Sequence, residues 1–170
     1  ILYKLIKNKK IYDFNKKFFF YDIGTIRDFK SAQKSLLKYI KRPAIFLDRD
    51  NTINQDKGYT YKFNDFKFIN NSFKALKYLS KKKIWIFIVT NQAGIAKGHF
   101  TEKNFINLHL KLKKKLLSQK IFIDEVKYCP YHPKAKIPKY RKHSSLRKPN
   151  NLMIKQILKN WPIDKKKSIM

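Results

Sequence analysis

The sequence has few of the residues that form cross-links or membrane spans. Its single cysteine, Cys129, cannot form an internal disulfide, which fits a reducing cytoplasm. The longest apolar run, residues 84–89, is far too short to cross a bilayer. No charged and then apolar leader follows Ile1, so we expect no signal peptide, no membrane contact and a cytoplasmic location.

Acidic residues are also scarce. There are 11 Asp and Glu against 41 Lys and Arg, which gives a net charge of +30. Such a charge suggests nucleic-acid binding. The lysines are spread through every segment, however, and neither zinc-finger spacing nor an aromatic ribonucleoprotein motif accompanies them. We attribute much of the charge to codon bias and expect no specific nucleic-acid partner.

The length and the apolar content indicate a folded protein of one domain, or one and a fraction. The chain has 170 residues, of which 43% are hydrophobic, enough for a packed core. It starts with Ile1 and not with Met, and it stops at Met170 after a lysine run. We therefore expect a chain that is truncated at both ends.

From Ala44 onward, short apolar runs alternate with amphipathic segments. The expected strands are 44–47, 84–89, 121–128 and the start of a fourth at 167–170, and the expected helices are 72–82, 101–118 and 150–160. Residues 90–98 and 129–149 are expected to be loops. This order predicts an α/β fold, a Rossmann-like parallel sheet flanked by helices, which is incomplete at the C-terminus.

The first 42 residues have a different pattern. Residues 1–24 look like short strand pieces that end at Gly24. Thr25 can cap a helix over 26–39, where Asp28 favours the helix N-terminus. We therefore expect a short strand-helix piece over 1–42 and a separate domain over 43–170.

Two carboxylates follow the first expected strand of that domain. Asp48 and Asp50 are spaced i, i+2, and in parallel sheets reactive groups lie beyond the carboxyl ends of the strands. Such a pair can share a Mg²⁺ ion. One carboxylate can attack a phosphorus atom while the other transfers a proton to or from the leaving oxygen. An exposed acidic turn is the alternative interpretation.

Two further polar strings complete the pattern. Thr90-Asn91-Gln92 ends the second expected strand, where a hydroxyl and backbone N–H groups can hold a phosphoryl oxygen, although a simple helix cap would look the same. Arg147-Lys148-Pro149 precedes the last expected helix and supplies a cation. Because lysines are so common in this chain, the charge of Lys148 is no evidence by itself. The evidence is its position after the other two motifs along the chain.

Together these strings resemble the haloacid dehalogenase superfamily of aspartate-nucleophile phosphatases. The resemblance covers residues 43–170 and is closest to the group of heptose 1,7-bisphosphate 7-phosphatases and histidinol phosphatases. It is carried by AIFLDRDNTIN, DKGY, VTNQAGIAKGHFTE, YCPYHP and LRKP.

The resemblance implies a role for each matching residue. Asp48 would be the nucleophile and Asp50 the acid and base. The Asp48 carboxylate and the Asp50 backbone carbonyl would bind Mg²⁺. Thr90 and Lys148 would stabilise the phosphoryl group. The residues implied to contact a sugar bisphosphate are Asp56, Lys57, Gly58, Tyr59, Thr90, Asn91, Gln92, Ala93, Arg147 and Lys148.

The chain departs from the family pattern at three points. Asn51 stands where the family usually has Gly, and Asn tolerates positive φ better than most residues. Many members bind zinc in the loop before RKP, but the matching positions here are Cys129, Tyr131, Ser144 and Leu146, so we expect no zinc. The acidic motif that completes the family's magnesium site would follow the fourth strand, beyond Met170.

The N-terminal piece has a resemblance of its own. Residues 18–25, followed by Asp28-Phe29 and Ala32-Gln33, look like the tail of a sugar-phosphate nucleotidyltransferase domain, in which Asp22 would help to bind the catalytic metal. Such an enzyme could use the product of a heptose bisphosphate phosphatase, so a fused or neighbouring nucleotidyltransferase would join consecutive steps. A private N-terminal extension is the alternative.

The leading hypothesis is a Mg²⁺-dependent enzyme that removes the 7-phosphate of D-glycero-D-manno-heptose 1,7-bisphosphate for a surface polysaccharide such as lipopolysaccharide. Three alternatives remain. Histidinol phosphatases share the motifs. A polynucleotide 3′-phosphatase would explain the charge and should bind DNA with strong salt dependence. A remnant without activity would serve only in assembly.

Overall fold

The computed structural model describes residues 2–8 and 21–170. The chain divides into two compact units, residues 1–39 and 40–170, and each is described by itself. In the first unit, α1 spans Leu2–Lys7 and α2 spans Ile26–Ile40. The expected strand pieces over 1–24 are therefore wrong for residues 2–7, whose mixture of apolar residues and lysine also suits a helix. Residues 9–20 lie outside the described part.

The start of α2 is as predicted. The Thr25 hydroxyl accepts a hydrogen bond from the Asp28 backbone N–H at 3.1 Å and donates to the Asp28 carboxylate at 2.6 Å. The cap satisfies one of the N–H groups that a helix leaves without an internal partner.

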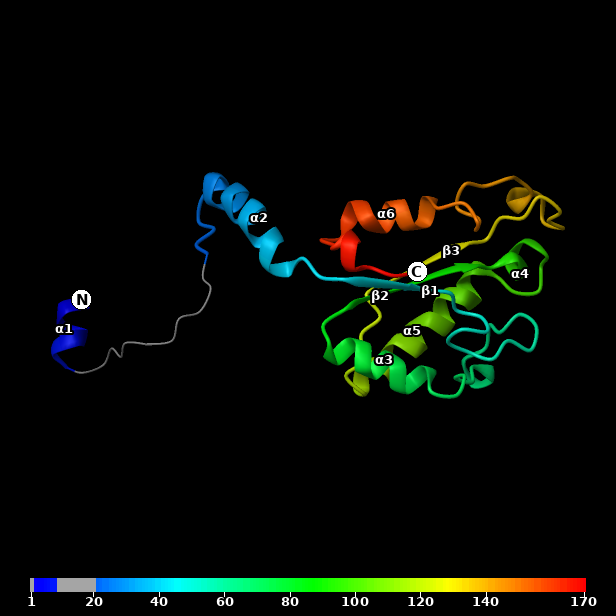
Figure 1. Cartoon of the computed structure of the whole chain (residues 1–170), viewed down its shortest axis with the longest axis horizontal. Helices are drawn as coiled ribbons and strands as arrows, with labels where there is room; N and C mark the ends of the chain where they lie inside the picture. The colour runs from blue at the N-terminus through cyan, green and yellow to red at the C-terminus, as the bar shows by residue number, and fades with distance from the viewer. Residues whose placement is uncertain (1, 9–20) are drawn as a thin grey trace. The chain divides into compact units, whose positions relative to one another are not determined.

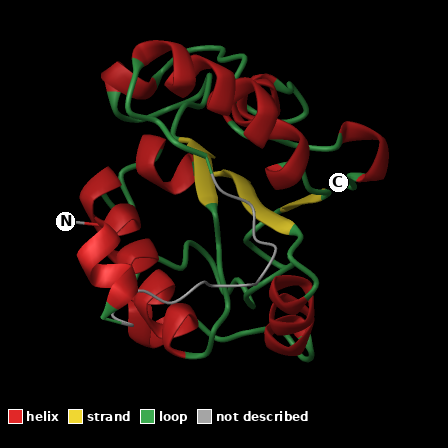
Figure 2. Ribbon diagram, turned by 90° about the vertical axis from the view of Figure 1, so that its left-hand side faces the viewer, coloured by secondary structure: helices red, strands yellow, loops and turns green. Residues whose placement is uncertain are grey.

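Among the described residues, three parallel strands form the sheet of the second unit, as expected. The strands are β1 (Ala44–Leu47), β2 (Trp85–Asn91) and β3 (Glu125–Cys129), in the order β1-β2-β3. Figure 2 shows them in yellow, side by side. In this register Leu47 pairs with Ile88 and Asn91 pairs with Cys129, so the carboxyl ends of all three strands lie at one edge.

The expected fourth strand is present only as a single bridge. Ile169 pairs in parallel with Ile45, and its N–H donates to the Ala44 carbonyl at 3.0 Å. The prediction placed its start at Lys167, but a 3₁₀ turn, η3 (Lys165–Lys167), occupies that position.

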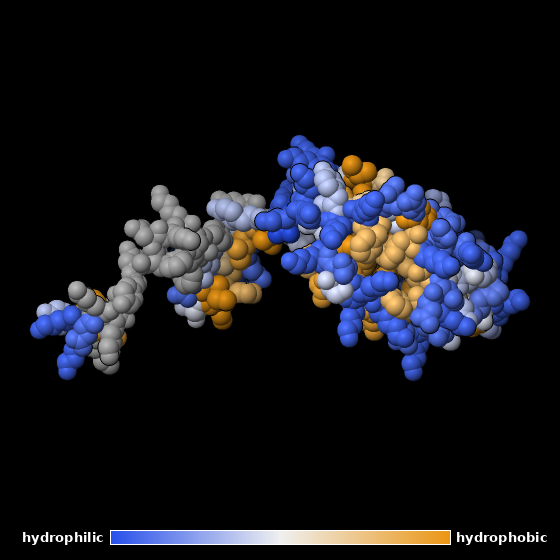
Figure 3. Space-filling model, turned by 90° about the horizontal axis from the view of Figure 1, so that it is seen from below, coloured by the Kyte–Doolittle hydropathy of each residue, from blue (hydrophilic) through white to orange (hydrophobic). Residues whose placement is uncertain are grey.

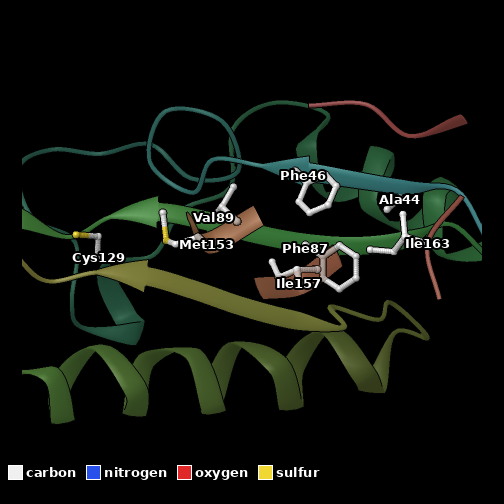
Figure 4. Close-up of a cluster of buried hydrophobic side chains, with 8 residues drawn as sticks. All are labelled: Ala44, Phe46, Phe87, Val89, Cys129, Met153, Ile157 and Ile163. Carbon is white, nitrogen blue, oxygen red and sulfur yellow. The ribbon is translucent and has the colours of Figure 1, made fainter. Parts of the chain in front are cut away.

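Helices cover both faces of the sheet (Figure 1). α6 (Leu152–Asn160) lies on one face, and α3 (Ser72–Lys81) and α5 (Glu102–Ser118) lie on the other. Side chains alternate along β2, so Phe87 and Val89 face α6 while Ile86 and Ile88 face α3 and α5. Figure 4 shows the cluster on the α6 side, where Met153 and Ile157 pack onto the strands.

The predicted boundaries differ from the structure at two further places. The third strand was expected from Ile121, but β3 begins at Glu125 because the Asp124 carboxylate accepts the hydrogen bond from the Ile86 N–H at 2.7 Å. The loop expected over 90–98 contains the end of β2 and a short helix, α4 (Ala93–Ala96). Two more 3₁₀ turns are η1 (Phe63–Asp65) and η2 (Pro138–Tyr140).

α5 begins where the sequence predicted and carries its apolar stripe inward. Thr101 and Asn104 form a reciprocal capping box. Ile106 and Leu110 remain 45% and 62% exposed, and Figure 3 shows an apolar area among hydrophilic residues on the side of α3 and α5. Within the described residues, none of the helices combines the length and the apolar character needed to cross a membrane.

Candidate active site

Asp48 and Lys148 meet at the carboxyl edge of the sheet. Asp48 directly follows β1, and Lys148 lies in the loop before α6. Lys148 Nζ lies 2.6 Å from Asp48 Oδ2, while Asp48 Oδ1 accepts a hydrogen bond from the Arg49 backbone N–H at 2.8 Å. The Asp48 side chain is 43% exposed, so one carboxylate is both oriented and accessible.

Asp50 is held by three neighbouring side chains. Arg49 donates to both of its carboxylate oxygens, from Nε at 2.8 Å and from Nη2 at 3.0 Å. Gln92 Nε2 donates to Oδ2 at 2.8 Å, and Asn54 Nδ2 donates to Oδ1 at 3.3 Å. Charge-assisted bonds of this kind fix the direction of a carboxylate. The sequence identified Asp50 and Gln92 but missed Arg49 and Asn54.

Gln92 connects the second carboxylate to the end of β2. Its side-chain N–H₂ also donates to Thr90 Oγ1 at 2.9 Å, and its backbone N–H donates to the Cys129 carbonyl at 2.8 Å. Thr90 is 1% exposed. Because Oγ1 accepts from Gln92, its own proton can point to an acceptor in the site.

Asn91 positions the loop that carries Lys148. Its Oδ1 accepts from the Lys148 backbone N–H at 3.0 Å, and its Nδ2 donates to the Lys148 carbonyl at 3.2 Å. An amide that satisfies both backbone groups of one residue fixes that residue against β2. The structure therefore brings together Asp48, Asp50, Thr90, Asn91, Gln92 and Lys148, as the sequence predicted.

A tight turn follows Asp50 and carries the DKGY string. Asn51, at the position where the family pattern has Gly, has φ 56°, in the left-handed region that Asn tolerates better than most residues. Asn51 Oδ1 accepts from the Asp56 N–H at 3.1 Å. Asp56 Oδ1 accepts in turn from the backbone of Gly58 and from Thr60. Asp56 thus shapes the loop, and Lys57 is exposed on it.

Tyr59 is linked to the segment after α4. Lys97 Nζ donates to Tyr59 Oη at 3.0 Å, and the His99 ring stacks on the Tyr59 ring with 4.1 Å between centroids. A Cβ on Gly94 would lie 2.7 Å from the Tyr59 ring, so this position accepts only glycine without rearrangement. The sequence had singled out Tyr59 but not Lys97 or His99. Ala93 begins α4 next to this segment.

A basic hollow of about 450 Å³ lies beside Lys148. Arg147 and His143 line it, and Arg147 Nη1 donates to the Tyr131 carbonyl at 3.5 Å. Five N–H donors on one guanidinium leave several free to bind an anion. Arg147 and Lys148 thus line this hollow together, and Asp50 does not line it.

The site offers oxygen donors of the kind that magnesium binds. Mg²⁺ prefers oxygen ligands, and the exposed Asp48 carboxylate supplies one. The Asp50 carboxylate is engaged by Arg49 and Gln92, which leaves its backbone carbonyl for the role that the family pattern assigns to it.

The loop after β3 does not fit a zinc ion. Cys129 is fully buried, burial raises the pKa of its thiol, and its Sγ contacts the Tyr131 carbonyl at 3.8 Å. Tyr131 and Leu146, at two of the four family positions, pack against the apolar cluster under α6. Over residues 2–8 and 21–170, no group of three or more His, Cys, Asp or Glu side chains could hold a metal. A Tyr131–Lys142 contact, with Nζ 4.0 Å from the ring centroid, braces the loop instead.

Glu102 links this loop to α5 and β3. Its carboxylate accepts hydrogen bonds from the hydroxyls of Tyr128 and Tyr140, each at 2.6 Å. Burial alone would raise the pKa of Glu102, but the two phenol bonds and the charge of Lys139 hold that pKa below its usual value.

Asp22 lies in the first unit, in the turn before α2. Its Oδ1 accepts from the Gly24 N–H at 3.0 Å. The bond closes a local turn, which is a common use of aspartate. A metal-binding role for Asp22 stays a prediction.

The parallel sheet with paired aspartates after its first strand resembles the fold of haloacid dehalogenase-like phosphatases. Solved structures agree. A HAD-like phosphatase from Mesorhizobium loti superposes with a TM-score of 0.68 at 31% identity, over 75% of this chain and 61% of that chain. D,D-heptose 1,7-bisphosphate phosphatase from B. bronchiseptica, complexed with magnesium and phosphate, gives a TM-score of 0.61 at 24% identity, over 70% and 63%, and shows the shared fold.

Sequence comparison defines the family. Residues 43–169 match the family described as polynucleotide kinase 3 phosphatase, and the chain belongs to that family. Among curated relatives, D-glycero-β-D-manno-heptose-1,7-bisphosphate 7-phosphatase of Haemophilus influenzae is 41% identical over 127 residues. The enzyme of the same name from Photorhabdus laumondii is 39% identical over 128 residues. Each alignment covers 75% of this chain and 68% of the relative.

Proposed function

We propose that the protein carrying this chain hydrolyses the 7-phosphate of D-glycero-D-manno-heptose 1,7-bisphosphate. The observation that carries the proposal is the accessible Asp48 carboxylate, with Lys148 Nζ 2.6 Å away and Asp50 held two residues further on. The curated relatives named for this reaction support the substrate. Lysine beside the nucleophile can neutralise an incoming phosphate, as phosphoryl transfer requires.

The reaction would proceed in two steps. In the first, an Asp48 oxygen attacks phosphorus, the bond from phosphorus to the sugar oxygen breaks, and Asp50 gives its proton to that oxygen. In the second, Asp50 takes a proton from water, and the water oxygen attacks the aspartyl phosphate to release inorganic phosphate and free Asp48. Arg49, Asn54 and Gln92 together donate to both Asp50 oxygens, so Gln92 or Asn54 would turn away from the oxygen that carries the proton while Arg49 keeps Asp50 in place.

The phosphoryl oxygens would be bound by groups on two segments, β2 and the loop before α6. Lys148 supplies a cation, the Thr90 hydroxyl a proton donor, and Asn91 keeps Lys148 against β2. A bound Mg²⁺, held by the Asp48 carboxylate and the Asp50 carbonyl, would supply further positive charge at the transferring phosphate.

The rest of the substrate would enter the basic hollow beside Lys148. Its walls carry Arg147 and His143, which suit an anionic group such as a second phosphate. Tyr59, positioned by Lys97, would form the wall of the site on the side of the DKGY string. A bisphosphate therefore fits better than a single phosphate on an imidazole-bearing chain such as histidinol phosphate.

The test compares kcat/KM for heptose 1,7-bisphosphate and histidinol phosphate, with Mg²⁺ present. We expect a strong preference for the heptose. The reverse order would move the chain to the histidinol phosphatase branch. Charge reversal by Arg147→Glu should raise KM for the bisphosphate, with exposed Lys155→Glu on α6 as the control.

A polynucleotide 3′-phosphatase is the second candidate, favoured by the family description and by the net charge of +30. It predicts hydrolysis of a 3′-phosphorylated oligonucleotide, with binding that weakens steeply as salt rises. Turnover of that oligonucleotide above turnover of the heptose bisphosphate would favour this candidate.

We also infer that residues 1–42 belong to a sugar-phosphate nucleotidyltransferase. The support is the resemblance of residues 18–25, Asp28-Phe29 and Ala32-Gln33 to the tail of such a domain. The protein should then transfer a nucleotide to heptose 1-phosphate, and Asp22→Asn should abolish the transfer but not the phosphatase reaction. Transfer that is unchanged by Asp22→Asn would contradict the assignment.

A further inference from the structure

Arg49 is a fully buried cation with one unused side. Its relative exposure is 0%. Nε and Nη2 form one edge of the guanidinium, and that edge binds Asp50, with Nη2 also donating to the Thr60 carbonyl at 3.0 Å. Nη1 lies off that edge, and among the described residues it has no hydrogen-bond acceptor. A buried donor without a partner is costly, so such a group is expected to find an acceptor.

His109 on α5 is the complementary group. Its Nε2 is buried and also lacks a partner within the described part of the chain. Burial and the nearby charge of Arg49 lower the pKa of His109 to about 3, so the ring is neutral at physiological pH and one ring nitrogen is an acceptor.

Both groups lie against the Phe105 ring. The Arg49 guanidinium carbon lies 5.4 Å from the Phe105 ring centroid, and the His109 ring centroid lies 4.3 Å from the same ring. Phe105 and His109 are spaced i, i+4 on α5, which puts them on one helix face. Asn54 Oδ1 is a third buried atom without a partner among the described residues, but the Asn54 amide is held at Nδ2 by Asp50 Oδ1 and the Gln55 carbonyl.

We propose that Arg49 Nη1 donates a hydrogen bond to His109 Nε2 in the catalytically competent protein. His109 is thereby a positioning residue that acts through Arg49 on Asp50. The inference rests on the proposed phosphatase function for its catalytic consequence. The hydrogen bond would link α5 to Asp50, the residue proposed as both acid and base.

The kinetic test compares two substrates that differ in whether the leaving oxygen needs a proton from a general acid. Alkyl phosphates need a proton on the leaving oxygen, whereas p-nitrophenyl phosphate has a stable leaving group. The ratio kcat/KM reports the phosphoryl transfer to Asp48 and not the later hydrolysis. His109→Leu should lower it about tenfold for the sugar phosphate and less than about twofold for p-nitrophenyl phosphate. His109→Gln, which keeps an acceptor, should remain close to wild type.

Equal losses on both substrates, or no loss on either, would overturn the inference and leave the proposed function intact. Failure of the wild type on every phosphate ester would instead reject the proposed function. The hydrogen bond has its own measurement, ¹⁵N NMR of the histidine rings in the whole protein. A protonated Nδ1 and an accepting Nε2 on His109 would support the inference, and a protonated Nε2 would overturn it.

Discussion

Lys148 Nζ lies 2.6 Å from Asp48 Oδ2, although Asp48 comes early and Lys148 late in the sequence of the second unit. The pairing depends on Asn91, whose side-chain amide binds both backbone groups of Lys148. The lysine is therefore aimed by β2 at the carboxylate that follows β1. A partly exposed pair of this kind contributes little stability, so its geometry is better explained by a role in the site.

Lys148→Met should lower kcat by about two to three orders of magnitude, because it removes a cation from the transferring phosphate while keeping the length of the side chain. The measurement is steady-state hydrolysis of heptose 1,7-bisphosphate. The matched control is Lys155→Met on the exposed face of α6, which should leave kcat unchanged. A Lys148→Met variant with kcat within threefold of wild type would contradict the assignment.

Asp48→Asn should abolish the phosphatase activity, because the amide is a far weaker nucleophile than the carboxylate. Circular dichroism should show an intact fold, since Asp48 is partly exposed and Asn retains an acceptor for the Arg49 N–H. Asp65→Asn, in the exposed η1 turn, is the control. Activity of Asp48→Asn within tenfold of wild type would rule out Asp48 as the nucleophile.

Much of the second unit could be predicted because its signals are local. The strand Ala44–Leu47 is a continuous apolar run before two aspartates, and Thr101 is a capping residue before an amphipathic helix. Asp48 and Thr90 then fall at the carboxyl edge by the topology of a parallel sheet alone.

The parts that could not be predicted depend on partners distant in sequence. Arg49 is charged, so sequence reasoning expects it in solvent, and only the assembled Asp50, Thr60 and Phe105 environment explains its burial. β3 starts late because the Asp124 side chain replaces a backbone partner, which no periodicity reveals. α1 was expected as a strand because six residues are too few to distinguish the helical period of apolar residues from the strand period.

Glu102 should make the free energy of unfolding decrease as the pH becomes acidic. Its pKa is lower in the folded protein than in the unfolded chain, so its ionised form stabilises the fold above the unfolded value of about 4.3. That contribution is lost as pH falls through the folded pKa. Urea unfolding at pH 7 and at successively lower pH should show this loss in wild type and a smaller one in Glu102→Gln.

Tyr140→Phe removes one of the two donors to Glu102 and serves as the matched variant. It should reduce the acid dependence without abolishing it, because Tyr128 still donates. An acid dependence in Glu102→Gln as large as in wild type would show that other carboxylates determine it.

Metal analysis of the purified protein should find no stoichiometric zinc. Structural zinc needs four nitrogen or sulfur ligands, and here the two positions taken by Tyr131 and Leu146 supply packing surface instead. Treatment with a zinc chelator should therefore leave the melting temperature unchanged. Cys129→Ala should lower it modestly, because a buried thiol is lost from the cluster under α6. One zinc per chain that disappears in Cys129→Ala would contradict this prediction and would point to His132 or His143 as further ligands.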